Sequence, residues 1–397
     1  MPTITKTTST TASLEVEVDG RALSFTWLWL LDHCQSPKRF HPAAKQRLFG
    51  IFGTPPIQPA RSVAVIRDGE AVQITWRDDE RTFFTADFLA AVGEPATMYD
   101  VINGGQSLWS AASAANAMRI FEHNALMQSD SVLSDLLQAI RVNGLALVHD
   151  VPCDLSDTRK LVERISYIRS SIFGDIWQLR ADGALADTGS TSLEIKPHTD
   201  GTYNHDAPGI MALHCLRQAA SGGENVFVDG FQVAARIQAE QPEVFTLLTT
   251  VEIPGQYIGD GAYLAARRPV IRLDERGRTL QVSYNNHDRA PFSLPEPQMS
   301  ALYAALGAFD GMVQSLDNQV LIGVRAGDLI VVDNWRVLHG RRAFVGERHM
   351  AGCYLNREDF ESRLRMLARQ PLIMSRRDAG RGIETIPAPG ARSLECR

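Results

Sequence analysis

Residues 333–344 read DNWRVLHGRRAF, and together with KPHTDGTY at residues 196–203 they decide the fold. His198 and Asp200 are two residues apart, so on an extended strand their side chains project to the same side. In the other segment His339 follows a strongly apolar run. Two imidazoles and one carboxylate form the facial triad of non-haem Fe(II), which leaves positions open for a co-substrate and O2. The two segments predict one metal site.

Arg348 begins a stretch of alternating character shortly after His339. The planar guanidinium of an arginine can hold a carboxylate through two parallel hydrogen bonds, which a lysine does less well. We therefore expect Arg348 to bind a carboxylate of the co-substrate next to the metal.

The segments around these motifs alternate strands and helices without the βαβ rhythm of a parallel sheet. Helices are expected at residues 131–142, 156–168 (capped by Ser156), 231–239, 243–249 and 296–316. Strands are expected at residues 145–148, 210–216, 225–228, 270–273, 280–284, 329–333, 342–344 and 348–355. Many short strands separated by turn residues predict a mainly β fold, an antiparallel barrel or jelly roll, with flanking helices packed outside.

The first hundred residues predict a separate, β-rich module. Residues 14–18 alternate between apolar and acidic, a turn follows at 19–20, and residues 23–30 return as a second strand. A second hairpin is expected at 62–66 and 72–76, and Thr85 can cap a helix that ends near residue 92. We place the domain boundary near residue 100, which gives a small N-terminal domain at 1–100 and a larger domain at 101–397.

Composition and charge exclude several classes of protein. The chain has 397 residues and a formal charge of −6, whereas a nucleic-acid-binding surface is normally basic. Its five cysteines are odd in number and scattered, which favours a reducing, cytoplasmic environment over a disulfide framework. No apolar run approaches the ~20 residues of a membrane-spanning helix, and no signal peptide is recognisable. We expect a cytoplasmic protein whose partner is a small molecule rather than nucleic acid or a membrane.

The sequence resembles the gamma-butyrobetaine and trimethyllysine hydroxylase branch of the Fe(II)/2-oxoglutarate oxygenases. The likeness extends over residues 14–367 and is carried by LLDHC (30–34), FGDIWQL (173–179), PHTDGTY (197–203), GGENVFVDGF (222–231), YNNHDRA (284–290), RHMAGCY (348–354) and REDFESRLR (357–365). The resemblance implies a double-stranded β-helix, or jelly-roll, catalytic domain behind a small N-terminal domain, commonly in homodimers.

The resemblance also implies roles for particular residues. Fe(II) would be bound by His198, Asp200 and His339, and 2-oxoglutarate by Arg348, with help from Asn225 at a position where relatives have a Ser or Thr. An aromatic cage would hold a trimethylammonium group through cation–π attraction; the matching positions are Phe173, Trp177, Tyr203 and Tyr354. The anionic end of the substrate is expected at Asn286 and Arg289. Ser190 and Gly201 are smaller than their counterparts, so a bulkier or more highly charged anion, such as a phosphonate, would also fit.

Relatives in this branch often hold a structural zinc in the N-terminal domain through three clustered cysteines and a histidine. Only Cys34 remains here; Ser36 and Arg39 follow it, and Glu80 falls near the histidine position. Because a closed structural site needs four ligands, we expect no zinc.

The expected function is Fe(II)- and 2-oxoglutarate-dependent hydroxylation, with O2, of an unactivated C–H bond in gamma-butyrobetaine, giving carnitine. Trimethyllysine and a trimethylammonio-alkylphosphonate such as 2-(trimethylammonio)ethylphosphonate are alternative substrates. Two hypotheses of other classes stay open: a quaternary-ammonium binding protein without turnover, which would release no succinate, and a metal hydrolase that does not depend on 2-oxoglutarate.

Overall fold

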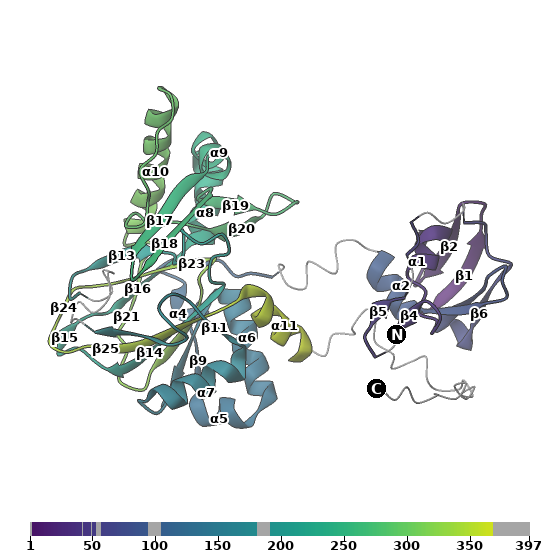
Figure 1. The fold of residues 1–397 in the computed structure, drawn as a ribbon, viewed down its shortest axis with the longest axis horizontal. Coiled ribbons are helices and arrows are strands. Elements are labelled where there is room, and N and C mark those ends of the chain that lie inside the picture. Colours follow the sequence, from purple (N-terminus) through teal and green to yellow (C-terminus); the bar gives the residue numbers. More distant parts are fainter. Residues whose placement is uncertain are drawn as a thin grey trace, which may run out of the picture. The chain divides into compact units, whose positions relative to one another are not determined.

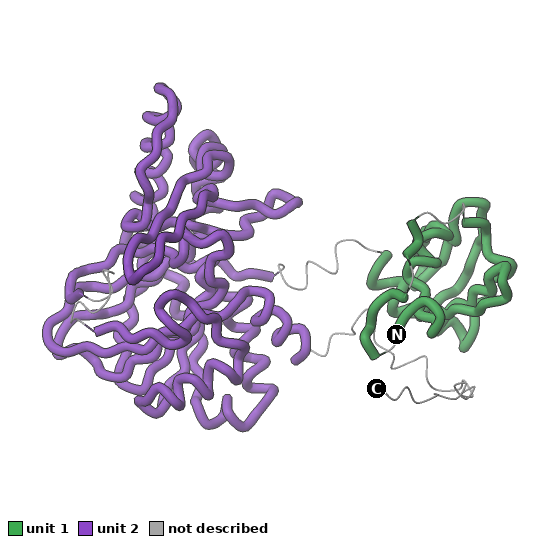
Figure 2. Tube along the Cα trace, in the orientation of Figure 1, with its two compact units in different colours: residues 1–104, 371–397 green, residues 105–370 purple. Residues whose placement is uncertain are grey.

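The computed structural model describes residues 2–41, 43–48, 50–52, 57–93, 105–180 and 191–367. The chain forms two compact units, one within residues 1–104 and the other within residues 105–370 (Figure 2). Among the described helices, none combines the length and apolar character needed to cross a bilayer.

The N-terminal unit contains two three-stranded antiparallel sheets (Figure 1). Their strands are β1 (Ile4–Ser9), β2 (Ser13–Val18) and β3 (Arg21–Thr26), and β6 (Ser62–Ile66), β7 (Ala71–Thr75) and β8 (Arg81–Thr85). The unit also contains two helices, α1 (Trp27–Asp32) and α2 (Ala86–Gly93). Its remaining elements are the short strand pair β4 (Phe40–His41) and β5 (Gln46–Arg47) and the 3-10 turn η1 (Arg67–Gly69).

Local capping explains where these helices begin. The expected cap of α2 is confirmed, since Thr85 Oγ1 accepts a hydrogen bond of 3.2 Å from the Phe88 amide. The strand expected at residues 23–30 is wrong in its second half. Thr26 Oγ1 accepts from the Trp29 amide at 3.2 Å, and this cap turns the chain into α1.

The larger unit contains a seven-stranded and a four-stranded sheet. The order of the large sheet is β11-β25-β14-β22-β10-β9, with β12 also paired to β25. Its strands are β9 (Arg119–Glu122), β10 (Leu145–His149), β11 (Ile168–Arg169), β12 (Trp177–Arg180), β14 (Ile210–Arg217), β22 (Leu329–Asp333) and β25 (His349–Leu355). The order of the small sheet is β13-β23-β16-β21, from β13 (Ile195–His198), β16 (Asn225–Asp229), β21 (Val320–Ile322) and β23 (Val337–Arg341).

Successive strands pass between the two sheets, as in a jelly roll: β12, β14, β22 and β25 lie in the large sheet, and β13, β16, β21 and β23 in the small one. A buried cluster joins the sheets, with Met211 and Met350 from one and Phe227 and Val337 from the other. The unit is thus mainly β with helices, as the sequence predicts. The described pairs in these two sheets are antiparallel except β9 with β10.

Helices cover the outer face of each sheet (Figure 1). Helices α5 (His123–Gln128), α6 (Asp130–Asn143), α7 (Leu155–Ile165) and α11 (Arg357–Leu367) pack their apolar residues on the large sheet. Helices α8 (Gly230–Glu240), α9 (Pro242–Thr250) and α10 (Gln298–Gln314) share a second buried cluster with Val228 and Leu338 of the small sheet. The short helix α4 (Ala114–Ala117) precedes β9. Alternate residues of a strand thus pack either against these helices or in the space between the two sheets.

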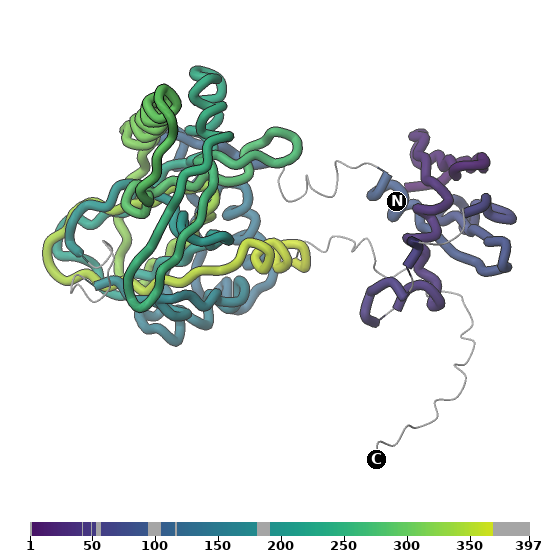
Figure 3. The backbone as a smooth tube through the Cα atoms, turned by 45° about the horizontal axis from the view of Figure 1, so that its top comes forward, coloured from purple at the N-terminus to yellow at the C-terminus, as the bar shows by residue number. Residues whose placement is uncertain are grey.

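The helix expected at 156–168 and the strand expected at 342–344 need correction; residues 342–343 are not in a strand, and the next strand begins at Phe344. The helix expected at 156–168 is capped by Asp154, whose Oδ1 accepts from the Asp157 amide at 2.8 Å, and it ends at Ile165. The hairpin of β17 (Ile253–Gly259) and β18 (Ala262–Arg268) was not expected; Figure 3 shows it in green, extending from the end of α9. Its two strands carry little apolar alternation that would reveal them. The small pairs β15 (Ser221–Gly222) with β24 (Phe344–Val345) and β19 (Ile271–Leu273) with β20 (Thr279–Val282) complete the unit.

Candidate active site

Strand register brings the two histidines together. His198 ends β13 and lies directly opposite His339 of β23, with ring centroids 4.6 Å apart. Asp200 lies between them just past the strand: its Oδ1 is 3.3 Å from His198 Nε2, and its Oδ2 is 3.5 Å from His339 Nε2. One candidate ligand atom from each of the three side chains lies within 4.8 Å of the others. The structure therefore assembles the three residues that the sequence singled out.

The backbone of Asp200 is held by a side chain that the sequence analysis missed. Asn334, from the DNW motif after β22, accepts from the Asp200 amide at 2.8 Å and donates to the Asp200 carbonyl at 3.1 Å. The next residue, Gly201, has a φ of 73°, and a Cβ there would lie 2.6 Å from Pro208. Gly201 therefore makes the turn that presents Asp200, and it does not enlarge the cavity as the sequence suggested.

Hydrogen bonding fixes the orientation of one of the three side chains. His198 Nδ1 lies 2.9 Å from the Lys196 carbonyl oxygen, and because a carbonyl only accepts, Nδ1 carries the hydrogen and Nε2 faces Asp200. Burial opposes a charge on His198, but the hydrogen bond and charge of Asp200 raise its pKa to about 9. Burial likewise opposes ionisation of Asp200, yet the two imidazoles hold its pKa well below the usual value. Burial lowers the pKa of His339.

The triad opens into a cavity between the sheets with about 940 Å3 of unoccupied space, counted to its open mouth. Its lining includes nine of the eleven side chains that the sequence assigned to the site: Phe173, Trp177, His198, Asp200, Tyr203, Asn225, His339, Arg348 and Tyr354. This size is in the range of small-molecule sites. Ser190 lies outside the described residues.

Aromatic rings form two groups in and beside this cavity. Trp177 and Tyr354 are 5.3 Å apart between centroids, and the Tyr354 hydroxyl donates to Asp200 Oδ2 at 2.9 Å. The Trp177 ring lies over Gly352, its partner across β12 and β25, where a Cβ would overlap the ring. Phe173 and Tyr203 each lie 5.3 Å from the ring of Tyr257 on β17. Tyr257 is another contributor that no sequence pattern indicated.

A buried cation lies at the cavity wall. Arg348, only 6% exposed, immediately precedes β25, and its Nη2 is 3.3 Å from Oδ1 of Asn225 on β16. Burial lowers the pKa of Arg348. The Nδ2 of Asn225 is buried without a hydrogen-bond partner among the described residues. A buried guanidinium and an unsatisfied amide donor are suited to an anionic ligand with several oxygen acceptors.

Asn286 and Arg289 are not brought together with the triad, because neither lines this cavity. Their side chains bond to each other, Arg289 Nη1 donating to Asn286 Oδ1 at 3.2 Å, and both line a second, smaller cavity. The intervening Asp288 faces the main cavity instead. Motif position alone could not show which residues of this segment face the metal. The role of Asn286 and Arg289 at the anionic end of the substrate stays a prediction.

The residues fit the iron and 2-oxoglutarate that the sequence implies. Two histidines and one carboxylate are a non-haem Fe(II) ligand set, and Arg348 with Asn225 offers donors to a dicarboxylate in the same cavity. Jelly-roll sheets around such a set are typical of mononuclear non-haem iron oxygenases.

The chain belongs to the taurine catabolism dioxygenase TauD, TfdA family, whose family model matches residues 112–354. The mitochondrial trimethyllysine dioxygenase of Mus musculus is 30% identical over 361 residues, which cover 89% of this chain and 85% of the relative. The trimethyllysine dioxygenase of Meyerozyma guilliermondii is 29% identical, with 93% and 98% covered. The gamma-butyrobetaine dioxygenase of a Pseudomonas species is 30% identical, with 88% and 92% covered. The protein is a dioxygenase that uses Fe(II), 2-oxoglutarate and O2.

His214 of β14 lies outside this site and leads to a prediction about acid stability. It is fully buried, and its Nδ1 is 2.7 Å from Thr158 Oγ1. Burial lowers the pKa of His214 to about 4, whereas an unfolded histidine titrates near 6.5. The unfolded chain therefore binds the extra proton first, so the free energy of unfolding falls by about 3 kcal/mol as the pH drops from 6.5 to 4.

Urea unfolding at pH 7 and pH 4.5 checks this expectation. His214→Asn should lose less stability between the two pH values than the unsubstituted protein, because the carboxylate contributions are common to both. Equal losses would contradict it.

Proposed function

We propose that this dioxygenase hydroxylates an unactivated C–H bond of a small trimethylammonium zwitterion, gamma-butyrobetaine or a close analogue, in the cavity between the two sheets. The observation that carries the proposal is the placement of Trp177 and Tyr354 in the same cavity as the three iron ligands, with Tyr354 bonded to one of them. Aromatic faces attract a quaternary ammonium by about 0.5–2 kcal/mol per favourable contact. The names of the relatives agree with this substrate class.

Each group of side chains has a part in this proposal. His198, Asp200 and His339 would hold the iron, which when bound supplies the oxidising power for C–H hydroxylation from O2 and 2-oxoglutarate. Arg348 and Asn225 would bind the far carboxylate of 2-oxoglutarate. Phe173, Trp177, Tyr203 and Tyr354 would surround the trimethylammonium group and keep water from the reacting carbon. The Tyr354 hydroxyl, which donates to Asp200, would also fix the orientation of that carboxylate.

A specific observation favours trimethyllysine as the second candidate. Asp288 places a carboxylate in the cavity, and its Oδ2 accepts from Asn285 Nδ2 at 2.7 Å. Trimethyllysine has an α-ammonium group to complement this charge, whereas gamma-butyrobetaine and 2-(trimethylammonio)ethylphosphonate have no second cation.

A substrate panel tests both readings. Succinate release and O2 consumption are measured with gamma-butyrobetaine, trimethyllysine, Nα-acetyl-trimethyllysine and 2-(trimethylammonio)ethylphosphonate. We expect turnover with at least one trimethylammonium compound and little with its unmethylated amine. If Asp288 binds an α-ammonium, Asp288→Asn raises KM for trimethyllysine and leaves KM for the acetylated compound unchanged. No coupled turnover with any of the four would refute the proposed substrate class.

We also propose that the N-terminal unit holds together without zinc. Beside Cys34, the Glu80 carboxylate accepts hydrogen bonds from the Ser36 hydroxyl and, at 2.9 Å, from Arg39 Nε. This arrangement puts an ion pair where four metal ligands would be needed. We expect metal analysis of the purified protein to find no stoichiometric zinc, and a chelator to leave the thermal unfolding of the unit unchanged. One bound zinc per chain would contradict this.

We further propose a cytoplasmic location and a homodimer. The free thiols of Cys34, Cys153, Cys215 and Cys353 support a reducing compartment, and the dimer rests on the family resemblance. Light scattering of the purified protein distinguishes a dimer from a monomer.

A further inference from the structure

The segment between β13 and β14, residues 199–209, carries two side chains of the active-site cavity but has no regular secondary structure. Asp200 lies near its start and Tyr203 in its middle. The segment turns tightly, and the Asn204 amide donates to the Gly201 carbonyl at 3.0 Å. Because no strand or helix ladder runs through this segment, other contacts must fix the position of the Asp200 carboxylate.

Asn334 joins the two ends of this segment. In addition to its two hydrogen bonds with the backbone of Asp200, its Nδ2 donates to the Pro208 carbonyl at 2.9 Å. The backbone amide of Asn334 donates to the Gly209 carbonyl at 3.0 Å. Asn334 is only 1% exposed, and the oxygen and both hydrogens of its side-chain amide have partners. Only one orientation of the amide satisfies all of these partners.

Asn334 is itself held from the side of β22. The last residue of that strand, Asp333, accepts hydrogen bonds from the Trp335 amide at 3.1 Å and from Arg357 Nη1 at 2.7 Å. Trp335 Nε1 donates to the Ala207 carbonyl at 3.0 Å. Asp333, Trp335 and Arg357 do not line the active-site cavity. The position of Asn334 is therefore set by the fold rather than by a ligand in the cavity.

We propose that Asn334 is a positioning residue for the metal site, because it fixes the backbone of Asp200 with the carboxylate between the two imidazoles before Fe(II) binds. The carboxylate lies within 3.5 Å of both imidazoles. A ligand that is already held in the binding geometry loses less conformational freedom when the ion binds. The inference rests on the proposed role of Asp200 as an iron ligand and is independent of the identity of the substrate.

Anaerobic calorimetric titration of the full-length protein with Fe(II) tests this role. We expect Asn334→Ala to bind Fe(II) about 10–100-fold more weakly than the unsubstituted protein, the range typical for groups that orient metal ligands. Asn334→Leu has nearly the shape of asparagine but no hydrogen-bonding group, so it should show the same loss without leaving a cavity. It also replaces Asn334→Ala if that variant does not fold. Unchanged Fe(II) affinity in either folded variant would overturn the proposal.

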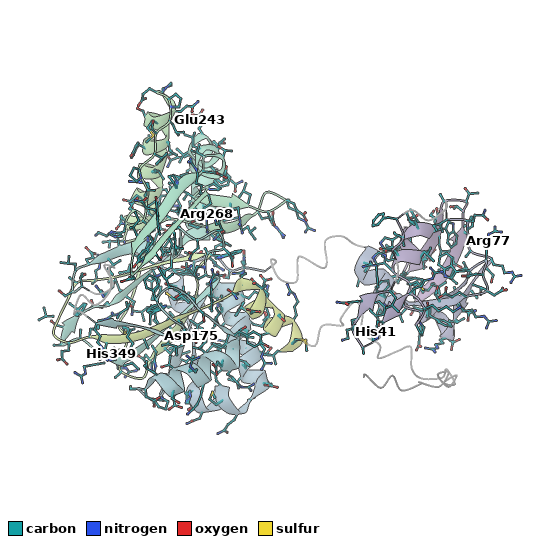
Figure 4. The ribbon with its side chains drawn as sticks, in the orientation of Figure 1. His41, Arg77, Asp175, Glu243, Arg268 and His349 are labelled. Carbon is teal, nitrogen blue, oxygen red and sulfur yellow. The ribbon has the colours of Figure 1, made fainter. Side chains whose placement is uncertain are left out.

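Two controls separate positioning from general damage. Asn318→Ala removes another buried asparagine, which is 2% exposed, donates to the Met312 carbonyl at 2.8 Å and does not line the cavity. It should lower the thermal midpoint but leave the Fe(II) affinity within about twofold. His349→Gln removes an imidazole of β25 outside the triad, labelled in Figure 4, whose Nε2 lies 2.8 Å from Gln178 Oε1. Its titration should also be unchanged. Equal weakening by Asn318→Ala would contradict a specific role of Asn334.

The dependence of turnover on Fe(II) gives a second readout. Asn334→Ala should need about 10–100-fold more Fe(II) for half-maximal succinate release, while its KM for 2-oxoglutarate stays within about twofold. The two constants separate because Arg348 bonds to Asn225 and not to residues 199–209. An equal rise in both constants would indicate damage to the whole cavity and would overturn the proposal.

The Fe(II) titration of Asp200→Ala distinguishes failure of this inference from failure of the ligand assignment. If Asp200→Ala binds Fe(II) as tightly as the unsubstituted protein, Asp200 is not a ligand and both conclusions are wrong. If Asp200→Ala loses Fe(II) binding while Asn334→Ala retains it, only the positioning role of Asn334 is wrong.

Discussion

Asp200→Ala is expected to reduce substrate-dependent succinate release by about 1000-fold or more, which corresponds to about 4 kcal/mol of lost transition-state stabilisation. The physical reason is that Asp200 is the one carboxylate in the proposed ligand set and lies within 3.5 Å of both imidazoles. Without it, two neutral donors remain to hold a divalent cation, and the Tyr354 hydroxyl loses its acceptor. Iron content after anaerobic reconstitution should fall together with turnover.

Asp206→Ala is the matched control for this variant. Asp206 is six residues further along the chain, is exposed, and pairs with Arg169 rather than facing the cavity. Its removal should leave iron content and turnover within about twofold, since exposed ion pairs contribute little. Retention of more than a tenth of the activity by Asp200→Ala, with iron still bound, would refute the assignment of Asp200 as a ligand.

The three candidate metal ligands could be named from the sequence because their segments match motifs of the resembled family; neither β13 nor β23 was among the strands expected. His198 and His339 belong to strands, and antiparallel pairing of β13 with β23 brings them opposite each other. The position of Asp200, in contrast, depends on Asn334 from a distant segment and on a positive φ at Gly201. Neither feature has a periodicity that can be read from one sequence.

The orientation of the segment expected to bind the substrate could not be predicted from the sequence, for a reason visible in the segment itself. Residues 284–290 were identified as part of the site, yet Asn286 and Arg289 face the second cavity while Asp288 faces the first. Backbone hydrogen bonds to a distant part of the chain hold this segment in place. The Asp288 carbonyl accepts from the Gln256 amide at 2.8 Å, and the Ala290 amide donates to the Pro254 carbonyl. The hairpin β17–β18 supplies these contacts and also carries Tyr257. Because the sequence did not reveal this hairpin, its effect on the orientation of residues 284–290 could not be predicted.

Arg348→Met is expected to raise KM for 2-oxoglutarate by about 100-fold or more, because loss of a buried charged partner in such a pair costs about 2–5 kcal/mol. Folding should not suffer in the absence of the co-substrate. Arg348 is buried and its described hydrogen bond is to a neutral amide, so its removal relieves the cost of burying the cation and leaves no charged partner behind. Thermal unfolding with Fe(II) under anaerobic conditions should then show that 2-oxoglutarate stabilises the unsubstituted protein but not the variant.

Two further variants separate the charge of Arg348 from its shape. Arg348→Lys retains a cation but loses the planar fork, so its KM should lie between those of the unsubstituted protein and Arg348→Met. Arg342→Met removes a nearby arginine that does not line the cavity; its guanidinium donates to Glu194 and, at 3.1 Å, to Gln319. The KM of this variant for 2-oxoglutarate should be unchanged. If 2-oxoglutarate still stabilised Arg348→Met, the cation that binds the distal carboxylate would have to be another one, and Arg341, which also lines the cavity, would be the next residue to test.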